Sequence, residues 1–160
     1  MKSINYDLRY DGATAEQVYA MLGERDFREQ VCDFQGVLRR TVSVNGSGSG
    51  MNVSIDQVQA AEGIPSFARK FVGDEINIVQ KEAWSSPTAA AVNVEIPGKP
   101  GEMRGTVSIT EDDAGTTENV RMDVRVGIPL VGGKIEGLVA DMLGKALDTE
   151  HRTGVEWLAR

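Results

Sequence analysis

Cysteine and histidine are almost absent from this sequence, which has one of each, Cys32 and His151, among 160 residues. A single cysteine cannot form a disulfide within the chain, and this is typical of proteins from reducing compartments. One histidine, one cysteine and scattered carboxylates provide no metal-ligand spacing, so we expect no metal and no cofactor. Nucleophilic catalysis commonly uses a histidine as its base. Because His151 falls roughly opposite the apolar stripe of a predicted helix, we expect a solvated side chain and no catalytic residue there.

Long apolar runs and basic clusters are also lacking. No stretch reaches the roughly 20 apolar residues that a membrane helix needs, and residues 1–10 lack the apolar core of a signal peptide. We therefore expect a cytoplasmic protein with no integral membrane segment. Seventeen basic against 24 acidic residues give a formal net charge of -7. Since no block of basic residues forms, we expect no nucleic-acid partner.

The length and the 41% hydrophobic content predict one domain over residues 1–160. Alternation at the start predicts a half-buried strand over residues 2–10, whose apolar face carries Ile4, Tyr6, Leu8 and Tyr10. A capping box of Thr14 and Gln17 begins a short helix that ends near Gly23, and a second short helix covers residues 24–34.

A change of period to two after residue 37 indicates that the chain continues as strands. Residues 38–44 and 51–57 predict a hairpin whose flexible tip is the glycine-rich segment 45–50. Residues 64–72 are typical of one or two helical turns that carry Phe67 and Phe71. Four further strands follow, with these inward positions: Ile76, Ile78, Gln80, Glu82 and Trp84; Val92, Val94 and Ile96; Met103, Gly105, Val107 and Ile109; Val120, Met122, Val124 and Val126.

The C-terminal pattern predicts a helix of nearly 30 residues that begins at Pro129, a residue suited to a first helical position. Such a helix is about 45 Å long. Its single apolar stripe must lie on another element, and the stripe consists of Ile135, Leu138, Val139, Met142, Leu143, Ala146, Thr153 and Trp157.

This order of elements predicts the α+β class, with helices on one side of an antiparallel sheet. We expect a helix-grip fold, in which a curved seven-stranded antiparallel sheet, with two short helices after its first strand, holds the long C-terminal helix over its concave face. A cavity between sheet and helix follows from that geometry.

Three segments carry a family resemblance: residues 127–136 (GIPLVGGKIE), residues 71–84 (FVGDEINIVQKEAW) and residues 156–158 (EWL). The chain resembles, over essentially its whole length, an uncharacterised actinobacterial family of the START-like superfamily, also called SRPBCC. That superfamily includes the birch-pollen allergen fold, lipid-transfer domains and polyketide cyclases. The resemblance implies a helix-grip fold with a ligand cavity, and a fold alone does not assign a function.

The informative residues are polar side chains at inward strand positions, namely Arg40, Gln57, Gln80 and Glu82. Buried polar groups are costly unless they are paired, so a cavity or its mouth would account for them. In this interpretation Arg40 and Glu82 pair across the empty cavity. The alternative is that each residue lies near a strand end and turns to water.

Apolar and aromatic residues complete the predicted ligand-binding set. They are Tyr6, Tyr10, Phe67, Phe71, Trp84, Met103, Met122, Met142 and Trp157.

Three hypotheses about function remain open at this point. The first is a carrier or sensor that binds a small hydrophobic molecule, such as a lipid, a polyketide, a sterol-like compound or an aromatic metabolite. The second is an enzyme of the cyclase or dehydratase kind, in which Glu82 or Arg40 acts as acid, base or oxyanion support. The third is an interaction module with little cavity. The absence of a recognisable catalytic set favours the first.

Overall fold

The computed structural model describes the backbone of residues 1–160 and every side chain except that of Ser47. The elements are β1 (Lys2–Asp11), α1 (Ala15–Leu22), α2 (Arg25–Phe34), β2 (Arg39–Ser47), β3 (Gly50–Ala60), α3 (Ser66–Val72), β4 (Glu75–Ser86), β5 (Ala89–Glu95), β6 (Glu102–Asp112), β7 (Gly115–Arg125) and α4 (Gly132–Leu158). This order confirms the predicted α+β class.

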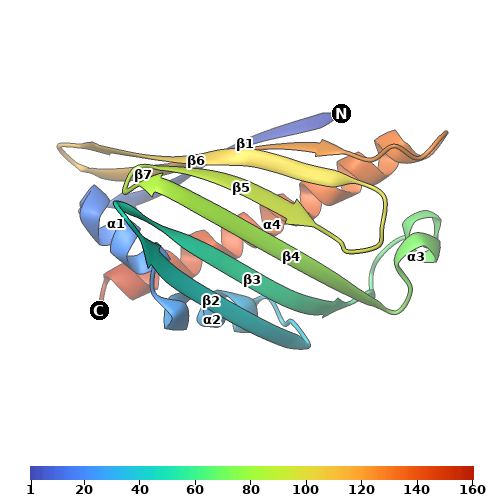
Figure 1. The fold of residues 1–160 in the computed structure, drawn as a ribbon, viewed down its shortest axis with the longest axis horizontal. Coiled ribbons are helices and arrows are strands. Elements are labelled where there is room, and N and C mark those ends of the chain that lie inside the picture. Colours follow the sequence, from blue (N-terminus) through green and yellow to red (C-terminus); the bar gives the residue numbers. More distant parts are fainter.

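The seven strands form one antiparallel sheet in the order β1-β7-β6-β5-β4-β3-β2, which leaves β1 and β2 at its two edges. Burial alternates along the strands, as in the sequence Met51, Val53 and Ile55 of β3. Figure 1 shows the sheet curving around α4. The concave face holds the apolar core, as the period-two pattern predicted.

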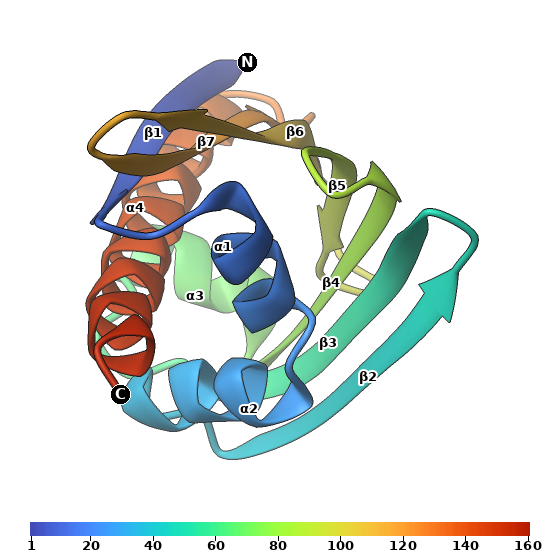
Figure 2. The same cartoon turned by 90° about the vertical axis from the view of Figure 1, so that its left-hand side faces the viewer.

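The two edges of the sheet are joined by helices rather than by strand pairing. Helix α4 lies against β1, α2 lies against β2, and the two helices contact each other. Seen from the end, the sheet, α2 and α4 therefore make a closed ring, with α1 set inside its near opening (Figure 2). This arrangement confirms the predicted helix-grip fold.

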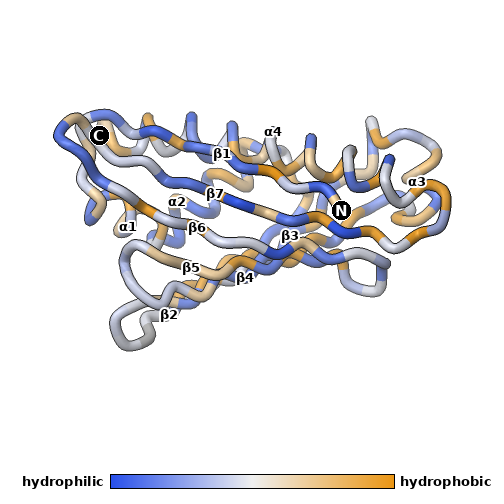
Figure 3. The backbone as a smooth tube through the Cα atoms, turned by 90° about the horizontal axis from the view of Figure 1, so that it is seen from above, coloured by the Kyte–Doolittle hydropathy of each residue, from blue (hydrophilic) through white to orange (hydrophobic). Residues whose placement is uncertain are grey.

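Helix α4 is one-faced, as its sequence pattern predicted. Its inward side presents Ile135, Val139, Met142 and Ala146 to the interior, while Trp157 packs edge-on against Phe27 of α2 at 5.5 Å between ring centroids. Figure 3 shows polar and apolar segments alternating along the strands. None of the helices in the described residues is both long and apolar enough to cross a membrane.

Two expected boundaries are wrong. The segment 45–50 is mostly strand, because β2 and β3 pair as far as Ser47 and Gly50. Gly50 is required there, since a Cβ atom would lie 1.7 Å from the carbonyl oxygen of Trp84. Helix α4 begins at Gly132 and not at Pro129, because Leu130 adopts a left-handed backbone (φ 72°) that a right-handed helix cannot contain.

Two glycines inside α4 set how closely the helix approaches β1. A Cβ atom on Gly144 would lie 2.6 Å from the hydroxyl oxygen of Tyr6, and one on Gly154 would lie 2.8 Å from the ring and hydroxyl of Tyr10. Glycine is unfavourable in a helix interior by about 1 kcal/mol relative to alanine. The tyrosine contacts explain why glycine nevertheless occupies these positions.

We expect Gly154→Ala to destabilise the protein by about 1–3 kcal/mol, the usual cost of overpacking. The Tyr10 ring is fully buried and has no room to move aside. Gly137→Ala in the same helix is the control, because its Cβ atom would meet nothing within 4 Å and should stabilise by up to about 1 kcal/mol. Urea unfolding of both variants tests this, and equal effects of the two substitutions would contradict it.

Candidate ligand cavity

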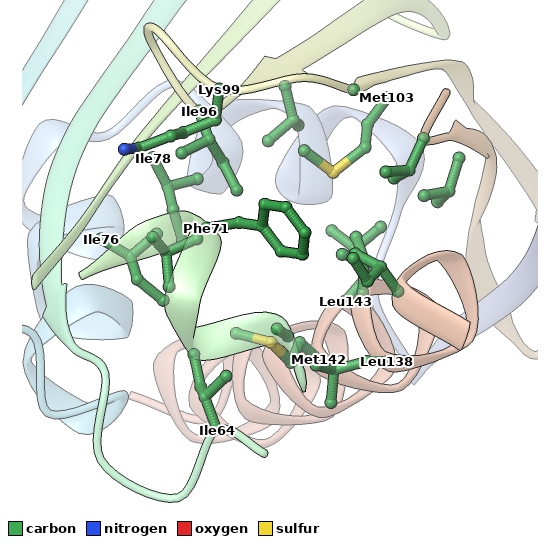
Figure 4. Close-up of a pocket in the computed structure, with 18 of the residues that line it drawn as sticks. Ile64, Phe71, Ile76, Ile78, Ile96, Lys99, Met103, Leu138, Met142 and Leu143 are labelled. Atoms are coloured by element: carbon green, nitrogen blue, oxygen red, sulfur yellow. The ribbon is translucent and has the colours of Figure 1, made fainter. Parts of the chain in front are cut away.

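The interior contains a cavity with two adjoining parts. The first, here called the outer chamber, has a volume of about 170 Å³ and lies between α3, the ends of β3 to β7 and the first half of α4. Its walls are mainly aliphatic. Figure 4 shows the ring of Phe71 in the middle, between Ile76, Ile78 and Ile96 on one side and Leu138, Met142 and Leu143 on the other.

The second part, here called the inner chamber, has a volume of about 80 Å³ and lies between α2, the second half of α4 and the middle of the sheet. The two chambers share six lining residues, which are Gln35, Gln57, Gln80, Val94, Leu143 and Ala146. The inner chamber is more polar, because one basic and three acidic side chains line it: Arg28, Glu82, Glu118 and Glu150.

Arg28 of α2 and Glu82 of β4 form a buried ion pair in the inner chamber. The guanidinium donates from Nη1 and Nη2 to the two carboxylate oxygens of Glu82, at 2.9 and 2.7 Å, and from Nε to the carbonyl oxygen of Leu22 at 2.8 Å. The side chains are only 3% and 4% exposed. A bidentate geometry of this kind is among the strongest polar contacts in proteins.

Glu82 has no acceptor capacity left for a ligand. Besides Arg28, its carboxylate accepts hydrogen bonds from Trp84 Nε1 at 2.9 Å and from Gln80 Nε2 at 2.6 Å. A carboxylate offers about four acceptor sites, and protein donors occupy all of them. Burial alone would raise the pKa of Glu82, but the charge of Arg28 and these hydrogen bonds outweigh it and lower the pKa.

Two further carboxyl groups lie near Arg28 without such partners. Glu150 Oε1 is 3.6 Å from Arg28 Nη1, which is too long for a hydrogen bond. Burial, only partly offset by Arg28, raises the pKa of Glu150 to about 7. Glu118 is 3% exposed, and its Oε1 has no hydrogen-bond partner among the described residues. Burial, with repulsion from Glu150, raises the pKa of Glu118 well above its ordinary value.

The structure brings seven of the thirteen predicted ligand-binding residues to the cavity. Phe71, Met103 and Met142 line the outer chamber, Glu82 and Met122 line the inner chamber, and Gln57 and Gln80 line both. Strand parity correctly predicted the inward positions of the five strand residues among them, whereas Phe71 and Met142 lie on α3 and α4.

Six of the predicted residues do not line either chamber: Tyr6, Tyr10, Arg40, Phe67, Trp84 and Trp157. The expected pairing of Arg40 with Glu82 is wrong, because Arg40 binds Asp33 and Glu29 on the surface of α2. Tyr6 and Tyr10 pack on α4, while Trp84 contacts Tyr19 and donates to Glu82. Tyr10 and Trp84 do point inward and are buried, but neighbouring helices cover them, whereas Tyr6 stays 40% exposed beside α4.

The expectation of a solvated His151 is also wrong. Its Nε2 atom lies 2.7 Å from the carbonyl oxygen of Arg9, and its ring packs against Tyr10 at 5.3 Å between centroids. The residue joins α4 to β1, and it does not line the cavity.

Sequence analysis missed three charged residues of the inner chamber. Glu118 continues the inward parity of Val120 and Met122 on β7, and Glu150 continues the apolar stripe of α4 after Ala146. Both signals were present in the sequence. Arg28 follows Phe27 and precedes Cys32 by one helical turn, so it lies on the buried face of α2. The sequence of this short helix does not indicate which other element Arg28 faces.

Comparison with solved structures identifies the class of fold. The chain superposes on a START superfamily protein from Mycobacterium smegmatis over 98% of both chains, with a TM-score of 0.64 and 14% identity. It also superposes on norcoclaurine synthase from Thalictrum flavum (TM-score 0.62, 14% identity, 97% of this chain and 94% of the other). A third match is the di-domain ARO/CYC StfQ from the steffimycin biosynthetic pathway (TM-score 0.64, 10% identity, 94% of this chain and 49% of the other). The protein therefore has the START-like helix-grip fold.

The family can be named more narrowly. Residues 5–158 match the model of the family described as "Protein of unknown function (DUF2505)", and the chain belongs to that family. A related protein, "Uncharacterized protein Rv0481c" of Mycobacterium tuberculosis, is 20% identical over 98% of this chain and 97% of its own length. These findings confirm the resemblance to an uncharacterised actinobacterial family, and the solved structures show that the chain has the START-like fold.

We expect Arg28→Ala to destabilise the protein by about 3–5 kcal/mol, because it leaves the carboxylate of Glu82 buried without its charge partner. Arg40→Ala is the matched control. Arg40 also binds two carboxylates, but it is 31% exposed, and surface pairs contribute about 1 kcal/mol or less. Chemical unfolding at neutral pH compares the two variants. Similar losses of stability would contradict the structural role assigned to Arg28.

Glu118 should make stability fall as the pH rises. Its pKa is higher in the folded state than the ordinary value of about 4.5. The stability that depends on a protonated Glu118 is therefore fully present below pH 4.5 and is lost as the pH rises towards the folded-state pKa. We expect Glu118→Gln to flatten this fall, by at most about 1.4 kcal/mol per pH unit, and to be more stable than the natural protein at pH 8.5.

Urea unfolding between pH 5.5 and 8.5 measures the effect of Glu118→Gln. The exposed substitution Glu95→Gln on β5 serves as the control for a change of one unit in net charge. Parallel stability curves for the natural protein and Glu118→Gln would show that Glu118 does not titrate as described.

Proposed function

We propose that this protein binds a small hydrophobic molecule in the cavity, as a carrier or sensor. The observation that carries the proposal is the continuity of an aliphatic outer chamber with a polar inner chamber, through the residues that the two share. Ligand sites usually combine a mostly apolar wall with a few polar groups that orient the ligand. Among the superposed proteins, one is a synthase and one an ARO/CYC protein by name, and their likeness to this chain supports the fold only.

The size of the cavity limits the ligand. An apolar cavity of about 150 Å³ holds one benzene molecule, so the outer chamber, at about 170 Å³, has room for one ring or a short aliphatic chain. A sterol-sized ligand needs more space. That space becomes available when α3 moves outward, because α3 places Phe71 in the middle of the chamber (Figure 4).

Helix α3 is suited to such a movement. It has seven residues, Ala68 is its one buried residue, and no side chain caps its N-terminus. Segments that bury little apolar area open at low free-energy cost. The outer chamber therefore has a cover that can move without disturbing the sheet.

Binding without turnover is favoured over the cyclase or dehydratase alternative. The two residues assigned as acid, base or oxyanion support, Glu82 and Arg40, are unsuitable. Glu82 is saturated with hydrogen bonds from the protein, and Arg40 lies outside the cavity. The interaction-module alternative is disfavoured by the chambers themselves.

A bulky side chain at the junction of the chambers should abolish binding. Ala146 lines both chambers, so Ala146→Phe fills the passage between them. We expect it to reduce binding of N-phenyl-1-naphthylamine, an apolar fluorescent probe that the cavity accepts when α3 moves outward, by at least tenfold.

Ala20→Phe on the exposed face of α1 is the control and should leave probe binding unchanged. Circular dichroism establishes that both variants fold. If folded Ala146→Phe binds the probe as tightly as the natural protein, or if the natural protein does not bind it, the cavity is not the ligand site proposed here.

A further inference from the structure

The inner chamber contains more acid groups than its single cation can balance. Arg28 is the one basic side chain that lines it, against Glu82, Glu118 and Glu150. The bidentate pair of Arg28 with Glu82 cancels one charge of each sign. Two carboxyl groups, Glu118 and Glu150, are left over.

Two buried polar atoms without partners also indicate that the chamber lacks a hydrogen-bond donor. Glu118 Oε1 and Gln57 Oε1 are buried, line the inner chamber and have no hydrogen-bond partner in the described part of the chain. Gln57 is 9% exposed and belongs to β3, whereas Glu118 belongs to β7. Leaving a buried polar group unpaired costs about 1–3 kcal/mol. A ligand that enters the chamber with N–H groups would satisfy both atoms.

A metal ion is a poor fit for the missing positive charge. In the part of the chain that the structure describes, no three carboxyl, histidine or cysteine groups converge in a geometry that could hold one. The glutamates instead surround a guanidinium, and Glu82 has no free acceptor. An organic cation needs only one or two carboxylates and an apolar body, and the two chambers supply both.

We propose that the inner chamber binds the basic nitrogen of an amphiphilic amine, whose apolar part occupies the outer chamber. This rests on the proposed function, because it assigns a chemical class to the ligand of the same cavity. Glu118 and Glu150 are the ion-pair partners of the ammonium group, and Gln57 accepts one of its hydrogen bonds.

Binding of an ammonium group should release a proton. The raised pKa values of Glu118 and Glu150 leave protons on the empty site near neutral pH. The groups that face Glu118 from neighbouring elements are Arg28, Glu82, Glu150 and Tyr10, and the ligand would be the one new positive charge among them. An ammonium ion enters with its own proton, the carboxyl ionises, and the displaced carboxyl proton passes to the solvent.

Three probes with the same apolar chain test the inference: octylammonium, octan-1-ol and octanoate. We expect octylammonium to bind at least tenfold more tightly than octan-1-ol, and octanoate to bind most weakly. Titration calorimetry at pH 6.5, in buffers that differ in ionisation enthalpy, should show up to one proton released for each octylammonium bound and none for octan-1-ol.

Two variants assign the effect to the inner chamber. Glu118→Gln should weaken octylammonium binding by at least tenfold and change octan-1-ol binding by less than twofold. Glu95→Gln makes the same change in net charge on an exposed strand position and should leave both affinities unchanged. If Glu118→Gln does not fold, the probe ranking and the proton release of the natural protein still decide the matter.

The outcomes separate this inference from the function on which it rests. If octan-1-ol or octanoate binds as tightly as octylammonium, or if no proton is released, the cavity binds apolar molecules but the amine assignment is wrong. If none of the three probes binds, the proposed function itself fails. If Glu95→Gln weakens octylammonium as much as Glu118→Gln does, the cation binds to the acidic surface and the inference is overturned.

Discussion

The ion pair between Arg28 and Glu82 is the interaction on which the rest of this structure depends. One guanidinium holds the carboxylate of Glu82 on β4 and the carbonyl oxygen of Leu22, the last residue of α1. It thereby ties α1, α2 and the middle of the sheet together at one point. Since α2 and α4 close the gap between β1 and β2, the position of α2 also sets where the ring closes and how much space remains inside.

A buried ion pair is seldom the most stable choice for a protein interior. Apolar residues of similar volume often serve as well or better, because desolvation of both ions offsets much of their attraction. Every nitrogen and oxygen atom of the two charged groups has at least one hydrogen-bond partner here, which lowers that cost. Glu118 and Glu150 have no such compensation, and burial therefore raises the pKa of both carboxyl groups. Natural proteins tolerate violations of this kind mainly at functional sites, where a ligand supplies what the protein lacks.

The apolar residues of the interior form a packed core at one end and line the outer chamber at the other. The aliphatic residues of the sheet and of α4 pack tightly wherever α1 and α2 cover the sheet, and this region forms the core. At the opposite end, the short helix α3, which connects β3 to β4, covers the outer chamber. The ring of its Phe71 lies in the middle of that chamber (Figure 4). One end of the ring is therefore filled by packed side chains, while the other end encloses an apolar chamber that a small helix closes.

The sequence alone determined the class of fold, the succession of elements and the side of each strand that faces inward. Local signals suffice for these features, because the capping box of Thr14 and Gln17 and the period-two pattern of the strands depend on residues a few positions apart. The family resemblance led to the same fold. Parity also placed Gln57, Gln80 and Glu82 on the inner face, and it could have placed Glu118 there.

Only the tertiary structure decided which inward residues line a cavity and which are covered. Trp84 and Tyr10 have the right parity, but α1 and α4 pack over them, and no local pattern shows where a helix distant in the sequence will lie. The partner of Glu82 was likewise undetermined. Arg28 lies on α2 and Arg40 on β2. Only the position of α2 in the closed ring directs Arg28 towards Glu82 and leaves Arg40 at the surface. Charge pairing across a fold depends on three-dimensional proximity, which period and composition do not contain.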